Sequence, residues 1–152
     1  MVLTLCGFNN SPGAAGNVLL EVFGPTLAVQ IGFDPTYDPQ NPGRPPALPQ
    51  NPIHALVDTG ALDSCIDTAL AMSLKLPIVD RRTVSGVHGT NEVNMHLAHL
   101  HVPSLMFTYG IFAGVSLRAG DQQHQALIGR SFLKNFTMVY EGRTGTVTIH
   151  NN

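Results

Sequence analysis

Seven of the eleven prolines in this chain of 152 residues fall between residues 34 and 52. Proline has no backbone N–H and holds φ near about −65°, so a segment this rich in proline cannot enter the interior of a β-sheet. The cluster therefore predicts a long surface loop, inserted between two strands. The same composition would also suit a polyproline-II ligand for a partner protein, and the sequence leaves that alternative open.

Short apolar segments separated by turn residues lie on both sides of this loop. Residues 27–33 alternate apolar with small or polar side chains at the strand period, and we expect residues 18–33 to form a hairpin that turns at Gly24-Pro25-Thr26. Further strands are expected at residues 53–57, 93–102, 105–112, 126–128, 137–140 and 146–149, and short helices at 66–76 and 130–136. The pattern predicts a mostly β chain, folded as one domain over residues 1–152.

The composition excludes several classes of partner. Charged residues make up 12% of the chain and the net formal charge is −2, and the eight lysines and arginines are scattered, which argues against binding to nucleic acid. The apolar start of the chain is too short for a signal peptide, and no segment is long enough to span a bilayer. We therefore expect a soluble, cytoplasmic protein with no membrane partner. Its two cysteines, Cys6 and Cys65, are expected to be free thiols, as in a reducing compartment.

The feature with the clearest chemistry is Asp58-Thr59-Gly60, directly after the apolar strand expected at residues 53–57. The strand would hold the carboxylate in the floor of a cleft, the Thr59 hydroxyl could lock the loop, and Gly60 permits close backbone approach. Peptide hydrolysis by this route needs two carboxylates that share a proton, one acting as base toward water and the other polarising the carbonyl. The chain contains one such triplet, so the pair would require a symmetric homodimer.

The neighbourhood of the triplet resembles the retropepsin-like aspartic proteases, the single-lobe relatives of pepsin. The similar segments are residues 56–61, the apolar-apolar-Gly-Arg stretch at 127–130, a glycine-flanked turn at 86–91 in the position of the family's flap, and a closing hairpin at 136–149. The resemblance implies an all-β, closed-barrel acid-protease lobe with one or two short helices. It further implies an aspartic endopeptidase that acts on peptide or protein substrates without a cofactor or metal.

Roles for individual residues follow from this resemblance. Asp58, Thr59 and Gly60 would be catalytic, and the substrate would be bound by residues from the loop, the flap and the adjoining strands: Leu56, Ala61, Leu62, Asp63, Val87, His88, Gly89 and Leu127. Leu62 stands where many viral members carry an aspartate that pairs with the later arginine. The partner of Arg130 is therefore left open.

Other acidic residues and the histidines have simpler explanations. Asp63 and Asp67 could each cap the following helix, and Asp63 could also line the cleft or meet Arg130. A pair formed by Asp58 with one of them would instead indicate glycoside hydrolysis, but the loop signature explains Asp58 without it. On a strand His99 and His101 share a face and His96 points away, so we expect surface or rim histidines and no metal site.

A rival from another class is a catalytically inactive retropepsin-like domain. Such a domain would keep the fold and use the cleft, or the proline-rich loop, as a scaffold to hold a protein partner. The sequence does not distinguish it from an active peptidase.

Overall fold

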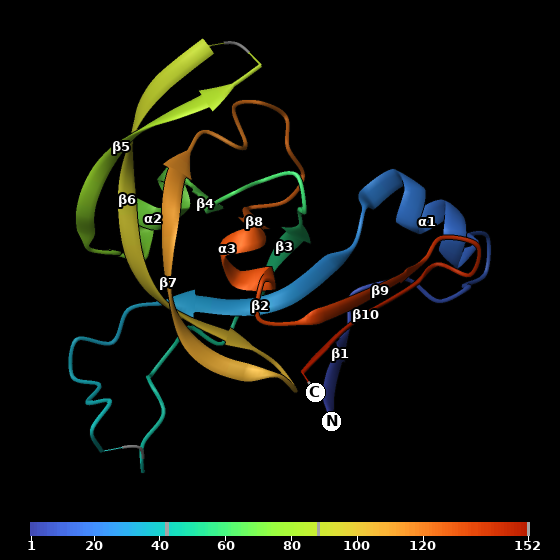
Figure 1. Cartoon of the computed structure of the whole chain (residues 1–152), viewed down its shortest axis with the longest axis horizontal. Helices are drawn as coiled ribbons and strands as arrows, with labels where there is room; N and C mark the ends of the chain where they lie inside the picture. The colour runs from blue at the N-terminus through green and yellow to red at the C-terminus, as the bar shows by residue number, and fades with distance from the viewer. Residues whose placement is uncertain (42, 88, 152) are drawn as a thin grey trace.

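The computed structural model describes residues 1–41, 43–87 and 89–151, and β-strands dominate it (Figure 1). The elements are, in chain order, β1 (Val2–Leu5), α1 (Gly16–Phe23), β2 (Thr26–Gly32), β3 (Ile53–Val57), β4 (Ser64–Asp67), α2 (Thr68–Ser73), β5 (Ile78–Gly86), β6 (Gly89–Val102), β7 (Met106–Val115), β8 (Ala126–Ile128), α3 (Arg130–Leu133), β9 (Thr137–Glu141) and β10 (Thr146–Asn151). The strands expected after the proline-rich loop are confirmed. The helix expected at residues 66–76 is shorter, because its first residues belong to β4.

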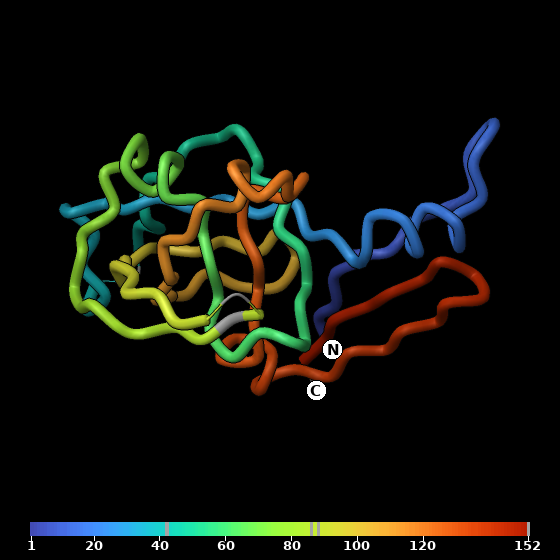
Figure 2. Tube along the Cα trace, turned by 90° about the horizontal axis from the view of Figure 1, so that it is seen from above, coloured from blue at the N-terminus to red at the C-terminus, as the bar shows by residue number. Residues whose placement is uncertain are grey.

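Seven strands form one sheet in the order β2-β3-β8-β4-β7-β6-β5, and β2 also pairs with β6, so this sheet curves back on itself. The β3–β8 and β4–β7 ladders are parallel and the other ladders are antiparallel. A second sheet, β1-β10-β9, projects to one side together with α1 (Figures 1 and 2). Because β8 lies between β3 and β4, the loop that joins β3 to β4 must pass the end of β8.

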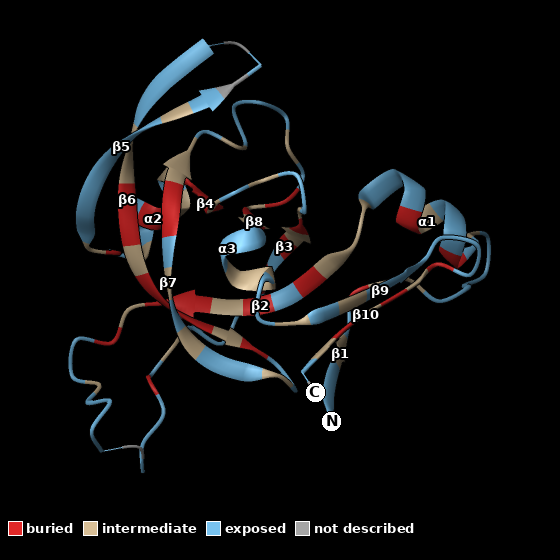
Figure 3. Ribbon diagram, in the orientation of Figure 1, coloured by how far each residue is buried: buried red, intermediate tan, exposed pale blue. Residues whose placement is uncertain are grey.

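One apolar cluster extends through both sheets. Leu27, Val29 and Ile31 of β2 are buried at the strand period, as the alternation predicted (Figure 3). Leu20 of α1 and Val147 of β10 belong to the same cluster. The small sheet and α1 are therefore attached to the large sheet by shared burial of apolar side chains.

The hairpin expected at residues 18–33 is wrong in its first half, because Gly16–Phe23 form a helix. A short apolar run fits either a strand or a buried helix, and its period does not separate the two. Gly24 ends the helix with a φ of 70°, and its N–H donates to the carbonyl of Leu20 at 2.9 Å. None of the helices in the described part of the chain has the length and apolarity needed to cross a membrane.

The proline-rich segment joins β2 to β3 and contains neither helix nor strand among its described residues. Asp34, which is 7% exposed, organises it. Its carboxylate accepts hydrogen bonds from the N–H of Ala47 (2.9 Å), the N–H and hydroxyl of Thr36 (2.9 and 2.7 Å) and the guanidinium of Arg44 (3.0 Å). The bonds from Ala47 and Thr36, together with the charge of Arg44, hold the pKa of Asp34 far below its usual range. The insertion is thus folded around one buried carboxylate.

His99 of β6 contacts the start of the proline-rich segment. The backbone N–H of Asp34 donates to Nδ1 of His99 at 3.1 Å, so Nδ1 carries no proton. The ring packs against Phe33 and Tyr109, with centroid separations of 5.3 and 4.6 Å. Nε2 is buried without a hydrogen-bond partner among the described residues. Burial lowers the pKa of His99, and the negative charge of Asp34 opposes this in part.

The expectation that the histidines of β6 lie at the surface is wrong for two of the three. His96 is 3% exposed and His99 is 2% exposed, whereas His101 is partly buried. Nδ1 of His96 lies 3.3 Å from the carbonyl oxygen of Leu76, and Nδ1 of His101 lies 2.7 Å from Oε1 of Gln30. These contacts come from segments far away in the sequence, which strand alternation alone does not reveal.

Gly7, Gly16 and Gly145 allow the backbones of the small sheet and α1 to pack closely. A Cβ on Gly145 would meet the backbone of Gly16, and a Cβ on Gly7 would meet the carbonyl oxygen of Gly145. Phe8 N–H donates to the Gly145 carbonyl at 2.8 Å, which continues the β1–β10 pairing beyond the ends of the strands. The turn between β9 and β10 therefore packs directly on the first turn of α1.

Replacing Gly145 with alanine should lower the free energy of unfolding by about 2–4 kcal/mol, because a φ of 82° and a backbone clash act together. Gly13→Ala is the matched control, since Gly13 has the same φ of 82° and open space around it. The free energy of unfolding of this control should fall by only about 1–2 kcal/mol, the cost of a positive φ for alanine. Urea unfolding of both variants measures the difference, and equal losses would contradict the packing described above.

The free energy of unfolding should fall as the pH drops below about 6.5, the usual pKa of histidine. Because burial lowers the pKa of His99, the unfolded chain takes up the proton more readily than the folded chain. The added proton would enter at Nδ1, where it meets the N–H of Asp34. His99→Gln keeps an acceptor but does not titrate, so its urea-unfolding free energy should fall less between about pH 7 and pH 5.

The unfolding free energy of His99→Gln should still fall in part as the pH drops, because burial also lowers the pKa values of His101 and His124. A slope identical to that of the native chain would show that His99 does not contribute to the pH dependence.

Candidate active site

Asp58 stands at the carboxyl end of β3 and is held there by main-chain bonds. Val57 pairs with Ile128 of β8, and the N–H of Asp58 donates to the carbonyl of Ile128 at 2.9 Å. The carboxylate Oδ1 of Asp58 accepts a hydrogen bond from the N–H of Gly60 at 2.9 Å. The side chain is half-buried. The sequence therefore places one fixed, solvent-accessible carboxylate at the edge of the sheet.

Hydrogen bonds from the segment after β8 hold the rest of the loop between β3 and β4. The N–H groups of Arg130 and Ser131 donate to the carbonyls of Ala61 and Leu62, each at 2.9 Å, and Nη1 of Arg130 donates to the carbonyl of Thr59 at 2.8 Å. These three bonds leave the loop little freedom to move, because its backbone is tied to a neighbouring strand and helix.

A further hydrogen bond joins Gly129 to Ser64, at the end of the loop. The N–H of Gly129 donates to Oγ of Ser64 at 3.0 Å, and both residues are buried. A Cβ on Gly129 would lie 2.6 Å from the carbonyl oxygen of Asp63, so the close approach needs glycine. This explains why the apolar-apolar-Gly-Arg stretch carries glycine at this position.

A cleft of about 450 Å³ lies between this loop and β5. Gly60, Ala61, Leu62 and Asp63 line one wall, and residues 83–85 of β5 line the other. The structure thus brings together four of the residues expected to act on or bind substrate. Residues 83–85 were not expected, although their position just before the 86–91 turn could have indicated them.

The β5–β6 hairpin projects from the large sheet (Figure 1), and residues 83–85 near its end line the cleft. Val87 at its tip is 99% exposed, and Gly89 is exposed with a φ of 107°. His88 lies outside the described residues. Of the expected flap tip, Val87 and Gly89 are therefore exposed to solvent.

Leu56, Leu127 and Cys65 lie side by side on three neighbouring strands. Leu127 of β8 pairs with Leu56 of β3 on one side and with Cys65 of β4 on the other. All three are partly buried. Leu56 also lines a second hollow, with Val22, Phe23 and residues 120–124. Of the three, Cys65 lines the cleft and Leu56 and Leu127 do not, so the structure does not bring these two expected substrate contacts into it.

Asp63 and Asp67, the acidic residues near the loop, have different partners. Oδ1 of Asp63 lies 3.9 Å from Nη1 of Arg82 on β5, and the side chain of Arg130 bonds to a backbone carbonyl and not to an acid. Asp67 accepts hydrogen bonds from the N–H groups of Leu70 and Arg118 at 3.4 and 3.1 Å, so it caps α2 as one alternative predicted. Arg82 was not expected at the site.

The thiol of Cys65 also lines the cleft. Both cysteines are free. Burial raises the pKa of Cys65 to about 11, and the charges of Asp63 and Asp58 add to this. A thiol with this pKa stays protonated at neutral pH and is a poor nucleophile. Within the described ranges of the chain, no group of three or more histidine, cysteine or acidic side chains is placed to bind a metal ion.

Comparisons with known proteins identify the family and similar structures. A model of the gag-polyprotein putative aspartyl protease family matches residues 48–135. A retropepsin-like aspartic protease from Rickettsia conorii is similar in structure, with a TM-score of 0.54 and 16% identity over 99% of this chain and 92% of that chain. The protease of EIAV, in complex with the inhibitor HBY-793, has a TM-score of 0.45 and 21% identity over 72% of this chain and 85% of that one. No curated protein sequence matches the chain significantly.

The likeness to the Rickettsia conorii structure shows the fold alone, since the identity is low. It confirms the prediction of a mostly β, retropepsin-like lobe with few helices.

Removing the Ser64 hydroxyl should weaken the whole loop. Ser64→Ala leaves the buried N–H of Gly129 without a partner, and we expect a loss of about 1–3 kcal/mol in the free energy of unfolding. Ser64→Thr, which keeps a hydroxyl on a strand position, should recover most of it. Thermal and urea unfolding of the two variants provide the measurement, and native stability in Ser64→Ala would contradict the role of this bond.

Proposed function

The chain belongs to the gag-polyprotein putative aspartyl protease family, and we propose that it is an aspartic endopeptidase that works as a homodimer. The observation that carries the proposal is the fixed carboxylate of Asp58. It stands at a strand end beside a cleft, and among the described residues its only hydrogen-bond donor is the N–H of Gly60. Family membership makes peptide hydrolysis the reaction that such a carboxylate would serve.

A second chain would complete the site. One carboxylate can act as base, but the reaction also needs a protonated acid, and two like charges at contact distance cannot both ionise. A two-fold axis beside Asp58 would supply an identical second carboxylate, and the shared proton gives the two groups their different roles. The single Asp-Thr-Gly triplet is consistent with this arrangement.

The reaction then proceeds in two steps. One Asp58 removes a proton from water as the water oxygen bonds to the peptide carbonyl carbon, while the protonated Asp58 of the other chain donates to the carbonyl oxygen. The tetrahedral intermediate then collapses: the Asp58 that took the water proton donates it to the amide nitrogen, the ionised Asp58 accepts a hydroxyl proton as the carbonyl re-forms, and the C–N bond breaks to release the amine. No cofactor takes part in either step.

The cleft would hold the substrate in an extended conformation between the loop and β5. The Gly60 N–H holds the carboxylate, the Thr59 carbonyl ties the loop to Arg130, and Ala61, Leu62 and Asp63 would contact the substrate from below. Val87, His88 and Gly89 would close over it as a flap when substrate binds. Leu56 and Leu127 would contact apolar side chains of the substrate.

Asp58→Asn tests the catalytic role. Asparagine keeps the shape of the side chain and an acceptor for Gly60, but it cannot take a proton from water. We expect cleavage of a peptide library to fall by at least about 10²–10⁴-fold, while sedimentation shows an unchanged dimer. Asp38→Asn, which removes a charge from the proline-rich loop, is the matched control and should cleave at the native rate.

Full activity in Asp58→Asn would exclude the mechanism. If the native protein shows no cleavage that an inhibitor of aspartic peptidases can block, the domain is a non-catalytic binding domain.

A further inference from the structure

A second groove lies beside the cleft, along the part of β7 that β4 does not cover. β7 has ten residues and pairs with β6 from Met106 to Ala113. β4 has four residues and pairs with β7 only from Phe112 onward. On the side that faces α3, residues 106–111 therefore have no partner strand among the described residues. Every second residue of a strand directs its N–H and C=O to the same side, so the main-chain groups on this edge have no partner strand there, although the Tyr109 carbonyl accepts from the Thr108 hydroxyl at 3.2 Å.

The open edge lacks the features that normally protect one. Exposed edges usually carry charges or proline, which prevent pairing with another chain. Residues 106–111 read Met-Phe-Thr-Tyr-Gly-Ile and contain neither. β5, at the end of the same sheet, carries Asp80, Arg81 and Arg82 in its middle. The contrast indicates that the β7 edge is kept available for a partner strand.

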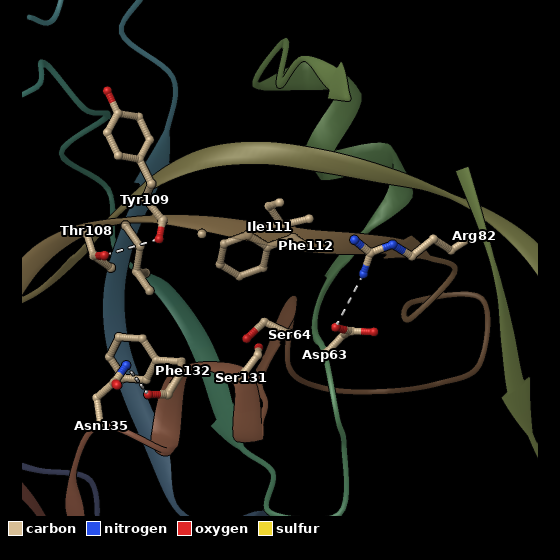
Figure 4. A pocket seen from close by; sticks show the side chains of 12 residues that line it. Asp63, Ser64, Arg82, Thr108, Tyr109, Ile111, Phe112, Ser131, Phe132 and Asn135 are labelled. Atoms are coloured by element: carbon tan, nitrogen blue, oxygen red, sulfur yellow. Dashed lines mark hydrogen bonds and ion pairs between the residues drawn. The ribbon is translucent and has the colours of Figure 1, made fainter. Parts of the chain in front are cut away.

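The groove has the shape for one extended chain. Its volume is about 280 Å³, and β7 forms one side while Ser131, Phe132 and Asn135 form the other (Figure 4). Phe132 is half-buried and stacks on Phe136 at 4.9 Å, so its ring offers a fixed apolar surface. Ser131 and Asn135 are exposed and can exchange hydrogen bonds with a ligand.

The groove continues the cleft. Asp63 lines both, and Arg82, which lies 3.9 Å from it, lines the groove where the two meet. The opposite charges of Asp63 and Arg82 compensate each other there. A neutral, extended polypeptide can therefore pass from the cleft into the groove without burying an unpaired charge.

We propose that this groove binds a flanking segment of the polypeptide substrate, which adds as a strand to the open edge of β7 while the scissile bond lies in the cleft. The proposal rests on the proposed peptidase function. Main-chain hydrogen bonds to β7 give the affinity, and contact with Phe132 favours an apolar side chain. Proline in the segment would remove a donor and weaken binding. The enzyme would thus prefer long, unfolded polypeptides to short peptides.

Two probes of different length test the preference. A pooled hexapeptide library fills the cleft alone, and reduced, carboxymethylated α-lactalbumin supplies a long unfolded chain. Asn135→Trp places a large ring in the groove. It should raise KM for the lactalbumin probe about 10-fold, equivalent to about 1.4 kcal/mol of lost binding, with kcat and hexapeptide cleavage unchanged. Lys134→Trp adds the same ring to a neighbouring position that does not line the groove, and it should match the native protein.

Hydrogen exchange separates this proposal from the peptidase proposal. In Asp58→Asn protein, the lactalbumin probe should slow exchange of amides in residues 107–111, and adding Asn135→Trp should abolish that protection. If the native protein shows this protection but cleaves neither probe, the groove is a binding site and the peptidase proposal is rejected. If it cleaves both probes, Asn135→Trp changes neither rate, and residues 107–111 are not protected, the groove proposal is rejected and the peptidase proposal stands.

Discussion

The hydrogen bonds between the loop after β3 and the segment from Ile128 to Ser131 are the constraint on which the site depends. They join parts of the chain about seventy residues apart, as in the bond from Arg130 to the Thr59 carbonyl. Because β8 lies between β3 and β4, the loop has both of its ends in strands that flank β8. It must therefore pass over the end of β8, where Gly129 leaves room for it. The position of the Asp58 carboxylate follows from this path.

The proline-rich insertion shows how a segment without regular structure can still be fixed. Asp34 satisfies four donors from its own loop, and its backbone N–H reaches His99 on β6. A buried carboxylate is stable only with such partners, since an unpaired one would take up a proton or return to water. The insertion is therefore attached to the sheet at its first residue. Its attachment is sensitive to protonation, because His99 accepts with the nitrogen that an added proton would occupy.

The sequence predicts the frame of the site better than its details. The local sequence pattern predicts where Asp58 and Gly129-Arg130 lie, since each follows an apolar strand. Strand period and turn residues depend only on neighbouring residues, so they can be read from the sequence. α1 was mistaken for a strand because a run of eight residues that is mostly apolar satisfies both periods. The partner of Arg130 could not be predicted, since it is a backbone carbonyl and every residue has one. The burial of His96 and His99 depends on segments that meet only in the folded chain.

The cleft and the groove have a common structural origin. The hydrogen bond from Gly129 holds the loop as far as Ser64, so β4 cannot begin earlier, and only the four residues Ser64–Asp67 remain for it before α2 begins at Thr68. β7 extends well past the start of β4, because its pairing with β6 continues down to Met106. The geometry that fixes the carboxylate thus also leaves the edge of β7 unpaired next to it. A longer β4 would cover the edge, but it would require a shorter loop and would withdraw residues 61–63 from the cleft.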